Sequence, residues 1–131
     1  MDQKIVIVCG GRSYNDRATV YKVLNELRPD VLVHGACGVD ADMQDWPHMR
    51  GVDAKADDWA IERGKAFQRR PAAWKRLGNK AGPIRNRQMA EEFPTATVIA
   101  FPGGDGTASM ISIAREAGMT VRLVTVDGVL L

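Results

Sequence analysis

The sequence predicts an α/β fold, a doubly wound sheet of about five mainly parallel strands with helices on both faces. Short runs rich in Val and Ile alternate along the chain with amphipathic segments of helix length. This alternation favours parallel strands joined by right-handed crossovers. Two of the apolar runs end in glycine-rich turns, which is typical of strands that present a ligand-binding loop. A length of 131 residues corresponds to one ordinary domain, so we expect a single domain over residues 1–131.

In the first half of the chain, the apolar run at 4–8 predicts a buried strand. Residues 16–27 follow as a helix, because their apolar side chains recur at helical spacing. Residues 31–34 repeat the strand pattern. A second helix is expected near 54–63 and a weaker strand near 65–68.

In the second half, a loop rich in Pro and Gly is expected over 71–82, followed by a helix over 83–93. Residues 97–101 form the fourth predicted strand. The last helix is expected over 108–117, opened by Thr107. The Val-rich segment 120–126 then predicts a fifth, buried strand.

Glycine-rich turns follow the first and fourth predicted strands, which lie side by side in the common strand order 3-2-1-4-5. The first turn is Cys-Gly-Gly-Arg-Ser at 9–13, and the second is Pro-Gly-Gly-Asp-Gly-Thr at 102–107. Glycine can adopt positive φ, and its backbone N–H can approach an anion closely. The following helix adds unpaired first-turn amides and a favourable dipole. We therefore expect two backbone cradles facing each other across a crevice, although such turns can also be simple tight connections.

A tandem repeat follows the second predicted strand. Residues 38–50, GVDADMQDWPHMR, match residues 51–63, GVDAKADDWAIER, at seven of 13 positions, which indicates a short duplication over 38–63. Pro47 interrupts helical hydrogen bonding in the first copy, so this copy is expected to be a loop or a broken helix. Asp40 or Asp53 could accept a hydrogen bond from a ribose hydroxyl, or could cap the following helix.

The basic residues are concentrated in one segment. Residues 63–87 hold nine Lys or Arg and no acid, which leaves nine basic groups against all 16 acidic ones elsewhere. This segregation favours an anionic partner, although a solvated basic face is the simpler alternative. Within the segment, Asn86 falls on the apolar face of a helix and is expected to point inward. Arg85 lies near the N-terminus of that helix, where a cation is unfavourable unless an anion compensates it. Trp74 could stack on a base, but a place in the core is the favoured interpretation.

Composition excludes several classes of protein. Hydrophobic content of 45% with 26% charged residues is globular, and no apolar run approaches the roughly 20 residues of a membrane span. The apolar run near the start is too short for a signal peptide, so a cytoplasmic location is expected. The two cysteines are interpreted as small buried thiols. No Cys-x-x-Cys or His-x-x-x-His spacing suggests a metal, and we expect neither metal nor cofactor.

The whole pattern resembles the small YspA-like members of the SLOG superfamily. The resemblance implies a Rossmann-like sheet that binds nucleotides or nucleotide-derived ligands, in proteins often found in bacteria and phages, and it suggests a homodimer or higher oligomer. It rests on short motifs in chain order. They are Gly10, Gly11, Arg12, Tyr14 and Asp16; His34, Gly35 and Ala36; Gly51, Val52, Asp53, Ala56, Asp57, Trp59 and Ala60; Trp74; Ala81, Gly82, Arg85, Asn86 and Met89; and residues 101–107.

One departure from the wider superfamily bears on catalysis. The chain is similar to LOG enzymes, which cleave ribose from nucleotide monophosphates, at the motif Pro-Gly-Gly-x-Gly-Thr-x-x-Glu. Met110 occupies the glutamate position here, and methionine can neither protonate a leaving base nor stabilise a developing cation.

We therefore expect a protein that senses or sequesters a nucleotide, an ADP-ribose- or NAD-derived molecule, or a cyclic nucleotide. A nucleotide N-ribosyl hydrolase that uses another acid is the alternative, with Asp16, Asp40, Asp53 and Asp105 as candidates. Binding of single-stranded nucleic acid is a third, less favoured possibility, and no membrane partner is expected. The expected ligand-binding residues are Gly10, Gly11, Arg12, Ser13, Gly35, Ala36, Cys37, Asp53, Trp74, Arg85, Asn86, Pro102, Gly103, Gly104, Asp105, Gly106 and Thr107.

Overall fold

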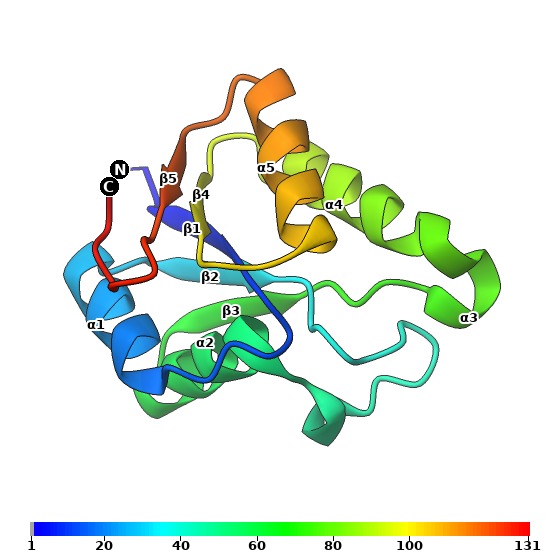
Figure 1. The fold of residues 1–131 in the computed structure, drawn as a ribbon, viewed down its shortest axis with the longest axis horizontal. Helices are drawn as coiled ribbons and strands as arrows, with labels where there is room; N and C mark the ends of the chain where they lie inside the picture. Colours follow the sequence, from blue (N-terminus) through cyan, green and yellow to red (C-terminus); the bar gives the residue numbers. More distant parts are fainter. Residues whose placement is uncertain (1) are drawn as a thin grey trace.

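The computed structural model describes residues 2–131 and contains a five-stranded, entirely parallel sheet (Figure 1). The strand order is β3-β2-β1-β4-β5, as predicted. The strands are β1 (Ile5–Cys9), β2 (Val31–His34), β3 (Ala66–Arg69), β4 (Thr97–Ala100) and β5 (Val121–Leu123). The α-helices are α1 (Arg17–Leu27), α2 (Gly51–Glu62), α3 (Trp74–Leu77), α4 (Ala81–Glu92) and α5 (Asp105–Glu116), with short 3₁₀ helices η1 (Trp46–His48) and η2 (Gly78–Lys80).

The helices cover both faces of the sheet, with α1 and α2 on one side and α4 and α5 on the other (Figure 1). The side chains of the central strand β1 show that both faces of the sheet are buried. Val6 and Val8 pack into the core formed with α1 and α2, whereas Ile7 packs into the core formed with α4 and α5. Because successive side chains of a strand point to opposite faces, a strand buried on both faces is apolar throughout.

The strand register brings the site-forming loops to one edge of the sheet. Cys9 at the end of β1 lies opposite Ala100 at the end of β4, and β1 also pairs with β2 in parallel. The carboxyl ends of the three central strands therefore lie together. The order of the chain reverses between β1 and β4, which is the usual position of a ligand site in this architecture.

The first repeat copy forms a loop with only η1 as regular structure, whereas the second copy forms α2. The prediction for the first copy is thus confirmed. Helix α2 begins at Gly51, three residues earlier than predicted. Gly51 adopts φ +62° there, which a side chain would strain.

Three further element boundaries differ from the predictions. Helix α3 and η2 lie inside the segment expected to be a loop. Helix α5 begins at Asp105, so Gly106 and Thr107 belong to its first turn; glycine is tolerated there because those N–H groups have no intrahelical acceptor in any case. Strand β5 ends at Leu123 and is only partly buried. It is an edge strand, and Val126 beyond it is 89% exposed. No helix within residues 2–131 is long and apolar enough to cross a membrane.

Candidate functional site

A pocket of about 530 Å³ lies beyond the carboxyl ends of the central strands. Its wall combines the turn after β1, the turn after β2, α2, the α3–η2 segment, α4 and the first turn of α5. Most residues expected at the site line it: Gly10, Gly11, Arg12, Gly35, Cys37, Asp53, Trp74, Arg85, Asn86, Gly104, Asp105, Gly106 and Thr107.

Four expected residues do not line this pocket, namely Ser13, Ala36, Pro102 and Gly103. The pocket also includes residues that were not among the expected ligand-binding residues: Val8, Cys9, Asn79, Gly82, Pro83, Met89, Ser109 and Met110. Val8 and Cys9 were expected to be buried, and a buried face that ends at a sheet edge also forms the floor of a pocket.

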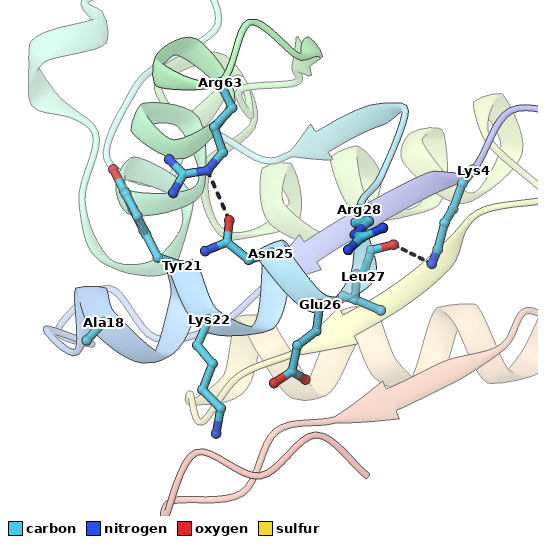
Figure 2. A pocket seen from close by; sticks show the side chains of 9 residues that line it. All are labelled: Lys4, Ala18, Tyr21, Lys22, Asn25, Glu26, Leu27, Arg28 and Arg63. Carbon is cyan, nitrogen blue, oxygen red and sulfur yellow. Dashed lines mark hydrogen bonds between the residues drawn. The ribbon is translucent and has the colours of Figure 1, made fainter.

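A larger, open depression of about 910 Å³ lies over α1 (Figure 2). Some of its polar side chains already bond within the protein: Lys4 donates to the carbonyl of Leu27, and Asn25 accepts from Arg63 at 3.0 Å. None of the expected site residues lines it. We therefore place the candidate site in the smaller, more enclosed pocket.

The two glycine-rich turns contact each other rather than face each other across a crevice. The Gly11 N–H donates to the Pro102 carbonyl at 2.9 Å. A Cβ on Gly103 would lie 2.7 Å from the Gly11 nitrogen and would collide with the Thr107 hydroxyl. None of the glycines in these turns has positive φ. Glycine is needed at 103 because the two turns pack too closely for a side chain, not because of backbone conformation.

The pocket instead opens onto the N-terminus of α5. Gly104 is the N-cap, and no side chain caps the helix there. The N–H groups of a first helical turn lack intrahelical acceptors, and the helix dipole adds partial positive charge. A Cβ on Gly104 or Gly106 would meet nothing within 4 Å. This end of the pocket therefore has space beside an uncapped helix end.

Arg85 reaches from α4 across the turn after β2. Its Nη1 donates to the carbonyls of Gly35 and Arg70, the second at 3.2 Å, and its Nε donates to Asn86 at 2.8 Å. Within residues 2–131 no carboxylate forms an ion pair with it. Burial lowers the pKa of the Arg85 guanidinium, and the negative charge of Asp53 opposes this change. A buried cation without a paired anion is costly, and this cation lies in the pocket wall.

Asn86 connects Arg85 to α5. Its amide is 3% exposed, as the helical spacing predicted. Its oxygen accepts from Arg85, and its nitrogen lies 3.5 Å from the Gly106 carbonyl and 3.4 Å from the Ser109 hydroxyl. Asn86 thus orients the guanidinium relative to the uncapped helix end.

Asp53, from the second repeat copy, lines the pocket, whereas Asp40 from the first copy does not. The Asp53 carboxylate is 7% exposed and accepts the Cys37 N–H at 3.0 Å. It therefore holds the turn after β2 instead of capping its own helix. Asp16, another candidate acid, caps α1 by accepting the Thr19 N–H at 3.0 Å.

Comparison with known proteins agrees with this geometry. Residues 4–55 match the family model YAcAr, described as YspA, cpYpsA-related SLOG family. This part of the chain is similar to the YspA-like SLOG family. The match covers less than half of the chain and runs from β1 into α2, so it includes the first glycine-rich turn and Asp53. The match to an SLOG family indicates a nucleotide-related function. The comparison with curated proteins finds no match.

A buried ionic cluster, which sequence reasoning missed, braces the pocket. His34 Nδ1 accepts the Ala36 N–H at 3.0 Å, so the ring proton is on Nε2, which donates to Asp57 at 2.8 Å. Arg69 makes two further bonds to Asp57, both 2.8 Å. Burial raises the pKa of Asp57, but the bonds from Arg69 and His34 outweigh it and lower the pKa to about 2. The sequence held one indication of this cluster, because Asp57 follows Asp53 by one helical turn and lies on the same buried face.

The apolar part of the pocket includes Trp74, Met89 and Met110. Trp74 is 42% exposed, so the preferred assignment of this residue to the core was wrong. Its indole lies against Gly82, where a Cβ would approach the ring to 3.0 Å. Met110 is 1% exposed and lines the pocket. The position that holds a glutamate in the LOG motif thus faces the site with a thioether.

Both cysteines line the pocket. Burial, followed by the charge of Asp53, raises the pKa of Cys9 to about 12 and also raises that of Cys37. Both thiols are therefore protonated at neutral pH, and neither is an activated nucleophile.

The basic segment is partly neutralised by acids from elsewhere in the fold. Arg69 pairs with Asp57, Arg70 with Glu92, and Arg76 with Asp42. Arg63 also lies 3.7 Å from Glu62. The nine cations are therefore not all available for one anionic surface.

Proposed function

We propose that this protein binds a nucleotide or nucleotide-derived ligand, with its phosphate near Arg85, Arg12 and the N-terminus of α5. The observation that supports this most strongly is the Arg85 guanidinium, which lies in the pocket wall and has no carboxylate partner among the residues that the structure describes. A phosphate would supply the missing anion, and arginine matches phosphate geometry with two parallel hydrogen bonds. The uncapped end of α5 would bind other oxygens of the same group.

The rest of the pocket suits the remainder of such a molecule. Met89 and Met110 offer an apolar floor, and Trp74 offers an exposed aromatic ring at the rim. Bases stack on aromatic side chains. A volume of about 530 Å³ lies within the usual range for small-molecule sites.

Binding without hydrolysis is the favoured form of the proposal. Met110 cannot act as an acid or base. Of the alternative acids, Asp16 caps α1, and Asp40 does not line the pocket and accepts two backbone N–H groups. Asp53 and Asp105 line the pocket and are the acids that a hydrolase mechanism would use.

Calorimetry with AMP, ADP-ribose, NAD and cyclic dinucleotides tests the proposal. Arg87→Ala is a matched control for Arg85→Ala, because Arg87 lies two residues further along α4, is exposed and does not line the pocket. A hydrogen bond to a charged group contributes about 1.5–3 kcal/mol. Arg85→Ala should therefore weaken binding about 10- to 150-fold, whereas Arg87→Ala should not. Equal effects of the two variants, or no binding to the wild type, would contradict the proposal.

Two further measurements separate the alternatives. After incubation and denaturation, chromatography should recover intact nucleotide, whereas release of free base would favour the hydrolase. Binding of single-stranded nucleic acid should weaken steeply with added salt, and a flat response would count against that function.

A further inference from the structure

The two copies of the repeat have different structures, but the equivalent aspartate of each holds a wall of the same pocket. In the second copy, Asp53 accepts the Cys37 N–H and fixes the turn after β2. In the first copy, Asp40 accepts the Lys75 N–H at 2.8 Å and the Asp42 N–H at 2.9 Å. Lys75 belongs to α3, which contributes Trp74 to the pocket rim.

Asp40 supplies a cap that α3 lacks in its own sequence. The N-cap of α3 is Ala73, which has no side-chain acceptor. A helix of four residues is too short to be stable alone. The Asp40 carboxylate comes from 35 residues earlier in the chain and bonds to the second N–H of α3, as an N-cap side chain normally does.

Other contacts join the same two segments. The Ala41 N–H donates to the Ala72 carbonyl at 2.9 Å, and Asp40 and Ala72 form a parallel bridge. Asp42 pairs with Arg76 at 2.6 Å. By contrast, the Trp74 ring rests on Gly82 and is 42% exposed. The backbone of α3 is thus held from one side, while the Trp74 side chain stays partly exposed.

We propose that residues 38–50 act as a clasp that positions Trp74 as a stacking platform for the aromatic base of the ligand, with Asp40 as the positioning residue. This inference rests on the proposed function, because it needs a ligand with a base. It also explains why the first copy of the repeat is retained as a loop: its role is to fasten α3, which a second copy of α2 would not do.

Two probes separate base stacking from phosphate binding: AMP, and ribose 5-phosphate, which has no base. Asp40→Ala should weaken AMP binding about tenfold, the scale of one base–aromatic stack, and should leave ribose 5-phosphate unchanged. Trp74→Ala should do the same. Because both substitutions remove the same stacking of Trp74 on the base, the double variant should bind AMP no more weakly than either single variant.

Asp45→Ala is the matched control, because Asp45 lies in the same copy and its exposed carboxylate pairs with the exposed His48. An equal loss of affinity for AMP and for ribose 5-phosphate in Asp40→Ala would indicate general damage to the pocket and overturn the inference. So would additive losses in the double variant. Arg76→Ala breaks only the pair with Asp42. It should weaken AMP binding less than Asp40→Ala does and should leave ribose 5-phosphate binding unchanged. This variant tests the inference if Asp40→Ala does not fold.

Hydrogen exchange supplies a test that needs no ligand. Asp40→Ala should raise amide exchange over residues 74–80 at least tenfold relative to Asp45→Ala, with no change in the central strands. Failure of AMP, ADP-ribose, NAD and cyclic dinucleotides alike to bind the wild type would overturn the stacking role together with the proposed function. Unchanged exchange with normal AMP binding in Asp40→Ala would overturn the clasp alone.

Discussion

Gly35→Ala should abolish most ligand affinity while leaving the fold almost intact. Gly35 is fully buried beneath the Arg85 guanidinium. A Cβ there would collide with Nη1, would lie 2.5 Å from Cζ and would lie 3.0 Å from Nη2 of Arg85. These atoms are the far end of a flexible side chain, so the arginine can move away without disturbing the backbone.

The size of the expected loss of affinity follows from the interactions of Arg85 that this movement breaks. The displaced guanidinium loses its bond to the Gly35 carbonyl and its alignment with Asn86. Loss of one hydrogen bond to the charged group of a ligand costs about 1.5–3 kcal/mol, which is about 10- to 150-fold in Kd. The cost in folding free energy should be smaller, about 1 kcal/mol, at the low end of overpacking effects.

Calorimetry with AMP measures the change in Kd, and chemical unfolding measures the change in folding free energy. In an Arg85→Ala background, Gly35→Ala should have no further effect on Kd, because the group it displaces is already absent. A full effect of Gly35→Ala in that background would refute the reasoning. A loss of several kcal/mol of stability in the single variant would do so too, since it would show that backbone rather than Arg85 must move.

Two other predictions concern the pocket and its brace. Gly104→Val should fold normally, because a Cβ there meets nothing within 4 Å, but it should lose AMP binding by filling the space beside α5; an unfolded variant in circular dichroism would show that the turn is structural. Asp57→Asn should reduce stability by about 3–5 kcal/mol at pH 7, the usual cost of breaking a buried ion pair. The wild type holds the pKa of Asp57 below that of the unfolded chain, at about 2. Its stabilisation is therefore complete above about pH 4 and is lost as the pH falls towards 2; urea unfolding across that range should show this slope in the wild type and not in Asp57→Asn.

The periodic patterns of this chain predicted the fold well, because burial on both faces of a parallel sheet leaves a strong local signature. Strand β2 has the predicted bounds, and the predicted strand order is confirmed. The errors lie at the ends of elements. Helix α3 was missed because its four residues have no capping side chain of their own, and the cap comes from Asp40.

For the candidate site, the sequence identified the glycine-rich turns, Arg85 and Asn86, but not how the glycines act. Positive φ was the expected reason for glycine in both turns, and it applies to neither. Gly103 permits contact between the turns, and Gly35 makes room for a guanidinium. Such close approaches join segments 50 or more residues apart and leave no local pattern.

The sequence by itself determined the sheet, the helix end beside it and the lack of an acid at Met110, since these depend on local periodicity and residue type. The tertiary structure alone decided which groups share the pocket. It placed Asp53 in the pocket wall and Asp40, the equivalent residue of the repeat, outside it. It also placed Trp74 at the pocket rim instead of in the expected core. It also showed that Arg85 has no carboxylate partner within residues 2–131. Charge pairing and exposure depend on side chains distant in sequence, so they become defined only when the chain is folded.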